Sequence, residues 1–343
     1  MENQSEEVPL GQVKVGVTFN LKHAEKTSET TPDAQAEYDS METVLAIASA
    51  IRSHGHQTVL LEADQTLPQR LLSEKPDLVF NIAEGYGGRA REAQVPALLN
   101  LFEIPFTGSD ATTLCLSLDK ALTKRVLSTY RIPTPRFRLF SPGAPVRIGG
   151  LRFPVIVKPN AEGSSKGIAD VCIANDAKTL KELVQKNFSL YGGDVLAEEF
   201  LSGREFTVGI LGNGETLRVF PPMEIVYHHS PIAGYNVYNY TVKQEYEKFV
   251  SYHCPAEIPA AMEQELIRLS KTIFLALGCH DFAQIDFRAD KAGKLYFIEI
   301  NPLPGLAPHY SDYPLLAEFC GMPHGELVYA VLRAGAERAG VRL

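Results

Sequence analysis

The sequence predicts an α/β protein built from more than one domain, and three observations support this prediction. The chain has 343 residues, which is too long for one small core and suits two or three domains. Up to residue 82, apolar strand segments alternate with helical segments, which is the order of a parallel, doubly wound sheet. Near the C-terminus, two strand segments joined by turn-forming residues indicate a hairpin, at 283–287 and 295–300.

The first domain is expected to open with a buried strand at residues 13–19. A polar stretch at 20–38 lacks periodicity and is expected as a loop above the end of this strand, where ligand-binding loops of α/β sheets lie. Ser40 or Asp39 is the expected N-cap of the next helix. The other elements expected here are strands at 57–61 and 77–82, helices at 41–53, 67–73 and 94–101, and a short strand and turn at 104–109.

The remainder of the chain predicts helices and strands around one long irregular segment. Residues 226–254 are rich in tyrosine and histidine, and irregular segments of this length are usually functional, so we expect a lid. Lys120 is expected in the first turn of a helix at 117–129. Further strands are expected at 153–158 and 195–200, a strand and turn at 201–211, and further helices at 177–187, 256–277, 315–320 and 325–339.

Composition narrows the class of protein. The net charge of −8 gives no reason to expect nucleic-acid binding, and no apolar run approaches the length of a membrane span. The N-terminal sequence MENQSEEVPLGQ is acidic and polar, unlike a signal peptide. The five cysteines are scattered without a CxxC pair, which argues against a zinc site or a disulfide framework. We therefore expect a cytoplasmic protein without nucleic-acid or membrane partners.

The C-terminal hairpin carries the residues of a predicted metal site. Because side chains alternate along a strand, Glu299 and Asn301 point to one face, and Asp286 on the paired strand can reach that face. Glu299 stands in the otherwise apolar run YFIEI, where a carboxylate is costly unless it is paired or binds a cation. Two carboxylates and an amide oxygen suit Mg²⁺ that also holds phosphate oxygens.

Two glycine-containing loops are candidate phosphate sites. Residues 85–90 match G-x-G-x-x-G/A, but they follow the third strand of their unit rather than the first, so a substrate-facing loop is favoured over a dinucleotide site. Lys158 ends a strand and precedes the small residues of 160–167, whose backbone N–H groups can fold over phosphates. Their spacing is not that of the Walker A motif GxxxxGK[ST]. This second loop therefore predicts a phosphate clamp.

Four sequence blocks together resemble the ATP-grasp enzymes, and among them the D-alanine–D-alanine ligases. The blocks are FTGSDATTLCLSLDK, PVIVKPNAEGSSKG, LAEEFLSGREFTVGILG and QIDF…YFIEINPLPG, and they occur in the family's order. The resemblance implies an ATP-grasp fold of three domains: a preATP-grasp substrate domain at 13–109, a central α+β domain at 110–195, and a C-terminal α+β domain at 196–343 with the lid at 226–254. In this family ATP lies between the last two domains.

The resemblance also implies roles for individual residues. Gly305 takes the place of the glycine whose N–H binds the tetrahedral oxyanion, and Asp286, Glu299 and Asn301 those of the ligands of two Mg²⁺ ions, with Mn²⁺ as an alternative. The positions that resemble the ATP site are Lys120 and Lys158 for the phosphates, Ser164, Ser165 and Gly167 for the loop over the γ-phosphate, Glu198, Phe200 and Leu201 for adenine, and Glu205 for ribose.

The departures from the family fall on the amino-acid side. Gln284 stands where the family has an arginine, and Lys243-Gln244, with Tyr246 close by, stands where its lid has a Lys-Tyr pair. Tyr310 replaces a serine, although Ser311 is adjacent. In the first domain, Glu84 replaces a histidine of the family. The loop that follows is longer and contains Arg89, Arg91 and Glu92. The family's N-terminal serine-glutamate motif is missing, and Glu37 aligns only loosely with its position.

The resemblance implies an ATP-dependent carboxylate–amine ligase that works through an acyl phosphate. We expect amino-acid-like small-molecule substrates other than two D-alanines, because the departures concern substrate positions. Glu84 suits a cationic group on a substrate, and Arg89 and Arg91 are either ligands of a second acid or solvated surface residues. Two alternatives stay open: an authentic D-alanine–D-alanine ligase, and a non-catalytic ATP-binding sensor. A homodimer is implied by the family alone.

Overall fold

The first sheet is parallel, as the sequence predicted. The structure is a computed structural model, and it describes residues 11–22, 37–162, 172–229, 234–239, 242–243 and 245–343. Strand β1 (Lys14–Phe19) lies between β2 (Gln57–Glu62) and β3 (Leu78–Asn81) and pairs with both in parallel. Helix α1 (Met41–Ser53) packs on one face of this sheet and α2 (Leu67–Glu74) on the other, so the sheet is doubly wound.

Local sequence signals explain several boundaries in this domain. Ser40 caps α1, and its Oγ accepts a hydrogen bond from the N–H of Thr43. Pro68 stands in the first turn of α2, where a missing N–H costs nothing. Helix α3 (Gln94–Leu101) follows the short 3-10 helix η1 (Arg91–Ala93). The strand expected at 104–109 is reduced to a single parallel bridge between Phe106 and Val79.

The helix expected at 117–129 is in fact two helices. Helix α4 (Ala111–Leu118) ends and α5 (Lys120–Thr129) begins at Asp119, whose backbone is extended at φ −82° and ψ 94°. The Asp119 carboxylate accepts a hydrogen bond from the N–H of Leu122, so its side chain replaces a helical bond of the backbone. This break makes Lys120 the first residue of α5.

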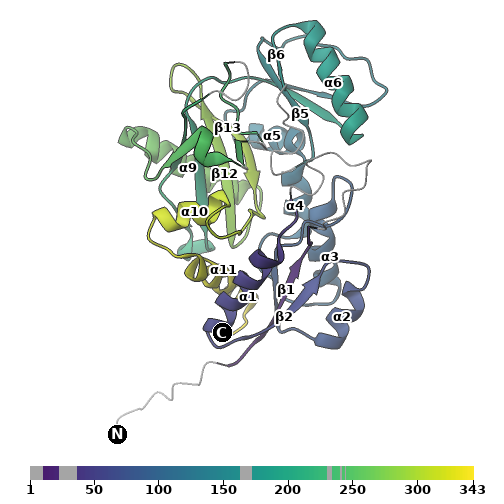
Figure 1. Ribbon diagram of the computed structural model, residues 1–343, viewed down its shortest axis with the longest axis vertical. Helices are drawn as coiled ribbons and strands as arrows, with labels where there is room; N and C mark the ends of the chain where they lie inside the picture. The colour runs from purple at the N-terminus through teal and green to yellow at the C-terminus, as the bar shows by residue number, and fades with distance from the viewer. Residues whose placement is uncertain (1–10, 23–36, 163–171, 230–233, 240–241, 244) are drawn as a thin grey trace.

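The central and third sheets are mainly antiparallel and stand apart in space (Figure 1). The central sheet, in the order β4-β7-β5-β6, is covered by α6 (Ala177–Tyr191); its strands are β4 (Phe137–Phe140), β5 (Val155–Pro159), β6 (Ile173–Ala174) and β7 (Val195–Glu199). The third sheet has the order β11-β10-β8-β12-β13, with β9 on β8; its strands are β8 (Glu205–Leu211), β9 (Arg218–Val219), β10 (Met223–Tyr227), β11 (Val250–His253), β12 (Phe282–Ala289) and β13 (Leu295–Asn301).

The segment expected to be irregular at 226–254 is partly regular. Its base is a pair of antiparallel strands, because β11 pairs with β10 from Glu224 opposite His253 to Tyr227 opposite Val250. The short helix α8 (Tyr246–Phe249) leads into β11. The sequence did not indicate β11 because a strand of four residues on a sheet edge carries little periodicity. A closing role for this segment stays a prediction.

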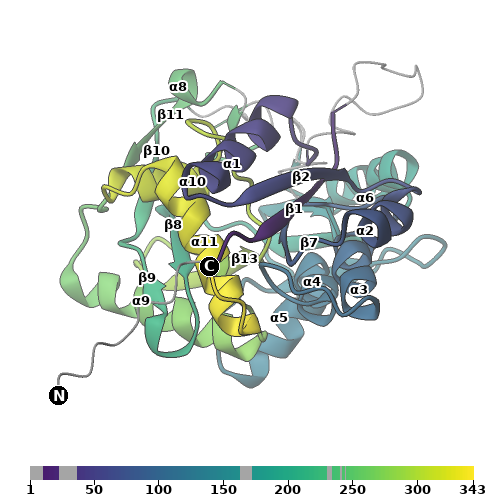
Figure 2. The ribbon, with the colours of Figure 1, turned by 90° about the horizontal axis from the view of Figure 1, so that it is seen from below.

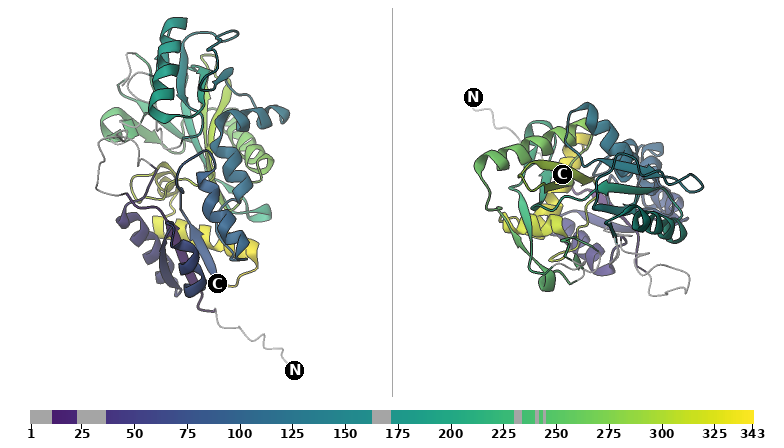
Figure 3. Two further views of the ribbon diagram at one scale, coloured as in Figure 1. Left: turned by 90° about the vertical axis from the view of Figure 1, so that its right-hand side faces the viewer. Right: turned by 90° about the horizontal axis from the view of Figure 1, so that it is seen from above.

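The C-terminal helices join the third sheet to the first domain. Helix α9 (Ala260–Ala276) covers the third sheet, and α10 (Asp312–Phe319) leads to α11 (His324–Ala339), which packs along α1 (Figure 2). Val15 of β1, Tyr313 of α10 and Val328 of α11 are fully buried in one shared core. Seen from the side, α4 and α5 run between the first domain and the central sheet (Figure 3). No described helix is long and apolar enough to cross a membrane.

Candidate active site

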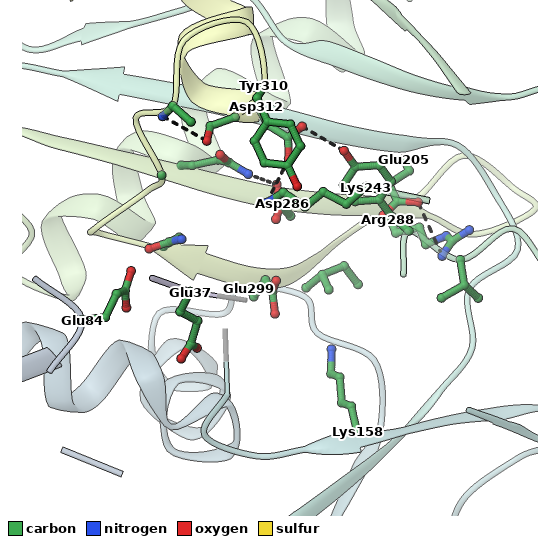
Figure 4. Close-up of a pocket in the computed structure, with 18 of the residues that line it drawn as sticks. Glu37, Glu84, Lys158, Glu205, Lys243, Asp286, Arg288, Glu299, Tyr310 and Asp312 are labelled. Atoms are coloured by element: carbon green, nitrogen blue, oxygen red, sulfur yellow. Dashed lines mark hydrogen bonds and ion pairs between the residues drawn. The ribbon is translucent and has the colours of Figure 1, made fainter. Parts of the chain in front are cut away.

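A cleft of about 360 Å³ lies where the first domain, the central sheet and the third sheet meet (Figure 4). This volume is in the range of small-molecule sites. Lys158 enters it from β5, Asp286 from β12, Glu299 from β13 and Glu84 from the loop after β3. The structure therefore gathers residues from all three parts of the chain around one cavity.

The predicted metal residues are brought together as the strand pattern indicated. Asp286 and Glu299 are directly paired neighbours across β12 and β13, and Asn301 lies one pleat further along β13. The Asp286 carboxylate accepts hydrogen bonds from Thr207 Oγ1 at 2.7 Å and from Gln284 Nε2 at 3.2 Å. Burial, and then repulsion from Glu299, raises the pKa of Asp286 to about 7.

This arrangement fits a divalent cation. A cation between the carboxylates would relieve the repulsion that raises the pKa of Asp286. Within the described ranges no three His, Cys, Asp or Glu residues gather around one point, so protein ligands alone would not complete a coordination shell. Two carboxylates and the Asn301 amide therefore suit Mg²⁺ that takes its other ligands from phosphate and water.

Two lysines face this acidic pair. Lys120 Nζ lies 3.4 Å from Glu299 and donates a hydrogen bond to the carbonyl of Glu162. Burial opposes ionisation of Glu299, but Lys120 and Lys158 outweigh it and leave its pKa below the usual value. Likewise, burial lowers the pKa of Lys158, but Glu198 and Glu299 outweigh it, so this pKa is raised. Lys158 is therefore a cation beside the candidate metal site.

Glu198 lines the cleft, and its carboxylate also belongs to a buried ion-pair cluster. Its carboxylate lies 2.7 Å from Lys158 Nζ and 3.1 Å from Lys124 Nζ, buried between β5, β7 and α5. Burial alone would raise its pKa, but the two lysines lower it to about 2. A contact between Glu198 and adenine stays a prediction. Lys124 was not anticipated from the sequence, although it follows Lys120 by one helical turn and so shares its face.

An apolar slot adjoins the lysines. It is lined by Ile156, Phe200, Leu201, Val237 and Ile298, which come from β5, the turn after β7, the lid segment and β13. Such a slot suits a planar ring system. Phe200 and Leu201, both predicted for adenine, thus line the same wall.

Glu205, predicted for ribose, lies at the end of this slot. Its carboxylate accepts a hydrogen bond of 2.6 Å from Tyr227 Oη, and Arg288 lies 3.7 Å from it. The guanidinium of Arg288 also lies over the Phe200 ring, 4.8 Å from its centre. Arg288 lines the cleft and was not anticipated, because the sequence placed it just beyond the expected strand at 283–287 and gave it no role.

Gly305 and Ser311 lie against each other at the far end of the cleft. A Cβ added to Gly305 would stand 2.8 Å from Ser311 Oγ. Ser311 Oγ also accepts a hydrogen bond of 3.3 Å from the N–H of Ala307. Tyr310 and Ser311 both line the cavity, and the atoms nearest to a Cβ added on Gly305 belong to Ser311; a substrate role for either residue stays a prediction.

The lid side of the cleft holds a buried acid. The Asp312 carboxylate accepts hydrogen bonds from Tyr238 Oη at 3.0 Å and Tyr252 Oη at 3.2 Å, and Lys243 Nζ lies 3.9 Å away. Asp312 and Lys243 both line the cavity. Lys243, expected to contact substrate, is therefore held towards the cleft by a carboxylate that no sequence motif singled out.

The first-domain wall is rich in carboxylates. Glu37, Asp39 and Glu84 line the cleft, and burial followed by repulsion from Glu92 and Glu37 raises the pKa of Glu84 well above its usual value. Burial also raises the pKa of Asp39 to about 7, although Lys22 partly offsets this effect. Several carboxylates of this wall could compensate the positive charge of a cationic group bound against it.

The two arginines of the loop after β3 have separate positions. Arg91 is buried; it pairs with Glu37 at 2.5 Å and donates a hydrogen bond of 2.8 Å to the carbonyl of Ala161. Arg89 is 67% exposed, pairs with Asp119 at 3.0 Å and is not among the cleft-lining residues. The structure thus separates Arg89 from Glu84. Ser164, Ser165 and Gly167 lie outside the described residues.

Gly85 shapes this loop, and its replacement is expected to destabilise the protein. Its φ is +72°, and an added Cβ would stand 2.1 Å from the carbonyl oxygen of Arg91. Gly87 has a similar φ of +64° but open space around it, so Gly87→Ala is the matched control. We expect Gly85→Ala to lower the free energy of unfolding by about 1–3 kcal/mol more than the control, through overpacking. Equal losses in urea unfolding would contradict this packing role.

Comparisons with known proteins agree with this geometry. The family model described as "D-ala D-ala ligase C-terminus" matches residues 146–333. The D-alanine–D-alanine ligase of Aquifex aeolicus is 37% identical over 85% of this chain and 94% of that protein, and the ligase of Bordetella pertussis is 31% identical over 94% and 95%. A crystal structure of the Bacillus anthracis D-alanine–D-alanine ligase complexed with ATP covers 96% of this chain and 99% of its own, with 20% identity and a TM-score of 0.73.

The structural match identifies the ATP-grasp fold, and the sequence match identifies the family. The weak G-x-G-x-x-A pattern at 85–90 leads into a short 3-10 helix and opens no long helix, so it lacks the structure of a dinucleotide site. The chain belongs to the D-alanine–D-alanine ligase family of ATP-grasp, ADP-forming carbon–nitrogen ligases.

Proposed function

We propose that this protein uses ATP to join a carboxylate to an amine through an acyl phosphate. The observation that carries the proposal is the pairing of Asp286 with Glu299 in one cleft with Lys158, while Lys120 Nζ lies 3.4 Å from Glu299. This combination of carboxylates and cations suits a metal-bound polyphosphate. The crystallised Bacillus anthracis relative is named as an ATP complex, which supports the same assignment.

In the proposed reaction, a substrate carboxylate oxygen attacks the γ-phosphorus and ADP leaves. The amine then attacks the acyl carbon, and phosphate leaves together with a proton from the amine. Asp286, Glu299 and Asn301 would hold Mg²⁺ or Mn²⁺, which neutralises phosphoryl charge when bound. Lys120 and Lys158 orient and neutralise the same oxygens, and the N–H of Gly305 is assigned to the oxyanion.

The amino-acid side of the cleft favours substrates other than two D-alanines. Gln284 brings no positive charge to the reacting carboxyl, and its amide is hydrogen-bonded to Asp286 instead. Glu84 lies on the opposite wall with a pKa raised by burial and by other acids, so a cation would be favourable there. We therefore assign one substrate an additional cationic group, such as an amino or guanidino function.

A panel of substrates tests this function. The protein is supplied with ATP and Mg²⁺, and phosphate release is measured with D-alanine alone and with pairs that include basic, acidic and β-amino acids. Mass spectrometry identifies each product. Fastest turnover with D-alanine alone would make the protein an authentic D-alanine–D-alanine ligase. The homodimer implied by the family belongs to the proposal too, and analytical ultracentrifugation tests it.

Lys158→Ala is expected to weaken ATP binding much more than adenosine binding. Lys158 Nζ is buried beside the candidate metal site, and the substitution would remove an ion pair with phosphate, which adenosine lacks. Calorimetry with ATP and with adenosine measures the two affinities. Equal weakening of both ligands would mean that Lys158 supports the fold rather than the phosphates.

A further inference from the structure

Lys124 is a fully buried lysine next to the cleft but not part of its lining. Its side chain on α5 has no exposed surface. Its Nζ donates a hydrogen bond of 2.7 Å to the carbonyl of Ile298, lies 3.1 Å from Glu198 Oε2, and lies 5.3 Å from the centre of the Phe297 ring. A charged amine is retained in such a place only when its partners compensate for the hydration that burial removes.

The partners of Lys124 belong to the two walls of the nucleotide site. Ile298 directly precedes Glu299 on β13, while Glu198 on β7 holds Lys158 of β5 through its other oxygen, at 2.7 Å. The ammonium group of Lys124 therefore links β13, which carries Glu299, to β7 and β5, which carry Glu198 and Lys158. Figure 1 shows α5 between these two sheets.

The positive and negative charges of the buried cluster around Glu198 do not cancel. Two ammonium groups share one carboxylate, so the cluster of Lys124, Glu198 and Lys158 has a net charge of about +1. Without Lys124, Glu198 and Lys158 would form a neutral pair, and the ammonium of Lys158 would be held by the carboxylate. With Lys124 present, Glu198 is shared by two ammonium groups, so Lys158 keeps its ion pair with Glu198 while the cluster retains positive charge for an anion in the cleft.

We propose that Lys124 is a positioning residue that shares the charge of Glu198 with Lys158 and thereby leaves net positive charge at Lys158 for binding nucleotide phosphate. The inference rests on the proposed ATP site. A lysine that merely filled the core would affect stability without distinguishing ATP from adenosine. The proposed role predicts a loss of affinity that depends on the phosphates of the ligand.

The test compares Lys124→Met with the unmodified protein by calorimetry. Methionine keeps much of the side-chain volume but brings no charge. ATP affinity is expected to fall about tenfold, and adenosine affinity to change less than about twofold. Lys14→Met is the matched control, because Lys14 pairs with Glu74 at 2.7 Å in the first domain and does not line the cleft. It should alter neither affinity.

The double variant Lys124→Met/Glu198→Gln separates charge compensation from packing. It removes both partners and leaves Lys158 as the single cation of the cluster, so the ratio of ATP affinity to adenosine affinity should return to within about threefold of that of the unmodified protein; loss of an adenine contact of Glu198 would affect both ligands alike. An ATP-specific loss in the double variant as large as that of Lys158→Ala would overturn the inference, as would equal losses of ATP and adenosine affinity in Lys124→Met. If Lys124→Met does not fold, the double variant decides alone.

Failure of the proposed function itself would look different. An unmodified protein that binds neither ATP nor adenosine would remove the nucleotide site altogether. An unmodified protein that binds ATP, together with a Lys124→Met variant that binds it equally well, would remove only the role of Lys124.

Discussion

Replacing Glu299 by glutamine is expected to abolish turnover to within the limits of a sensitive assay, a loss of roughly three orders of magnitude or more. Glutamine keeps the shape of the side chain but removes one of the two carboxylates that face each other across β12 and β13. The remaining Asp286 carboxylate and the Asn301 amide would then hold a cation with less charge. Phosphoryl transfer depends on that charge, so the rate should fall steeply.

Folding should survive this substitution. Glu299 is 35% exposed to the cleft, so its replacement leaves no buried acceptor unpaired, and it removes the repulsion acting on Asp286. Lys120 loses an ion-pair partner but keeps its hydrogen bond to the carbonyl of Glu162. Thermal unfolding should therefore stay close to that of the unmodified protein.

Glu182→Gln is the matched control for this experiment. Glu182 is an exposed carboxylate on α6, 3.9 Å from Lys178 and away from the cleft, so its replacement should change neither rate nor stability. Retention of most activity by Glu299→Gln at ordinary Mg²⁺ would refute the assigned metal site. The activity of both variants is measured as ADP release at saturating ATP.

The second large effect is expected at Glu84. If this carboxylate binds a cationic group, Glu84→Gln should lower kcat/KM for the preferred basic substrate by about 10–100-fold, because a charged pair becomes a neutral contact. Substrates without the extra cation should be affected far less, or even favoured. The ratio of the two kcat/KM values therefore reports the role of Glu84 independently of any general damage.

Glu103→Gln provides the comparison, since Glu103 is an exposed carboxylate of the same domain outside the cleft lining. It should leave the ratio unchanged. A uniform loss of kcat/KM across all substrates in Glu84→Gln would instead indicate that Glu84 supports the loop. Its neighbours Glu37 and Glu92 already raise its pKa, so removing one charge there should not destabilise the fold.

Much of this molecule follows from local sequence patterns. The strands of the first sheet were predictable because apolar runs between turn residues report burial directly. The hairpin of β12 and β13, and the approach of Asp286 to Glu299, followed from the alternation of side chains along a strand. Ser40 was one of two expected helix caps, and the structure shows that its side chain accepts the backbone N–H of Thr43.

Local patterns did not predict two features of the secondary structure. In one, a side chain replaces a backbone hydrogen bond of a helix, and in the other, a short strand forms only because it pairs with a neighbour. A helix from 117 to 129 was a reasonable prediction, but the Asp119 carboxylate takes over a helical hydrogen bond and divides it. Strand β11 exists because β10 offers it an edge to pair with. A short stretch of sequence shows neither the hydrogen bond of the Asp119 side chain nor the pairing of β11 with β10.

The sequence by itself predicted the fold class from its periodicity and the family from four sequence blocks, and it predicted which residues would form the phosphate and metal sites. Only the tertiary structure decided which charges meet. Lys124 and Glu198 come from different elements and pair at 3.1 Å, Ser311 rather than Tyr310 lies against Gly305, and Arg89 turns away to Asp119. Such partnerships depend on how three sheets pack around one cleft, and periodicity along the chain carries no information about distance across it.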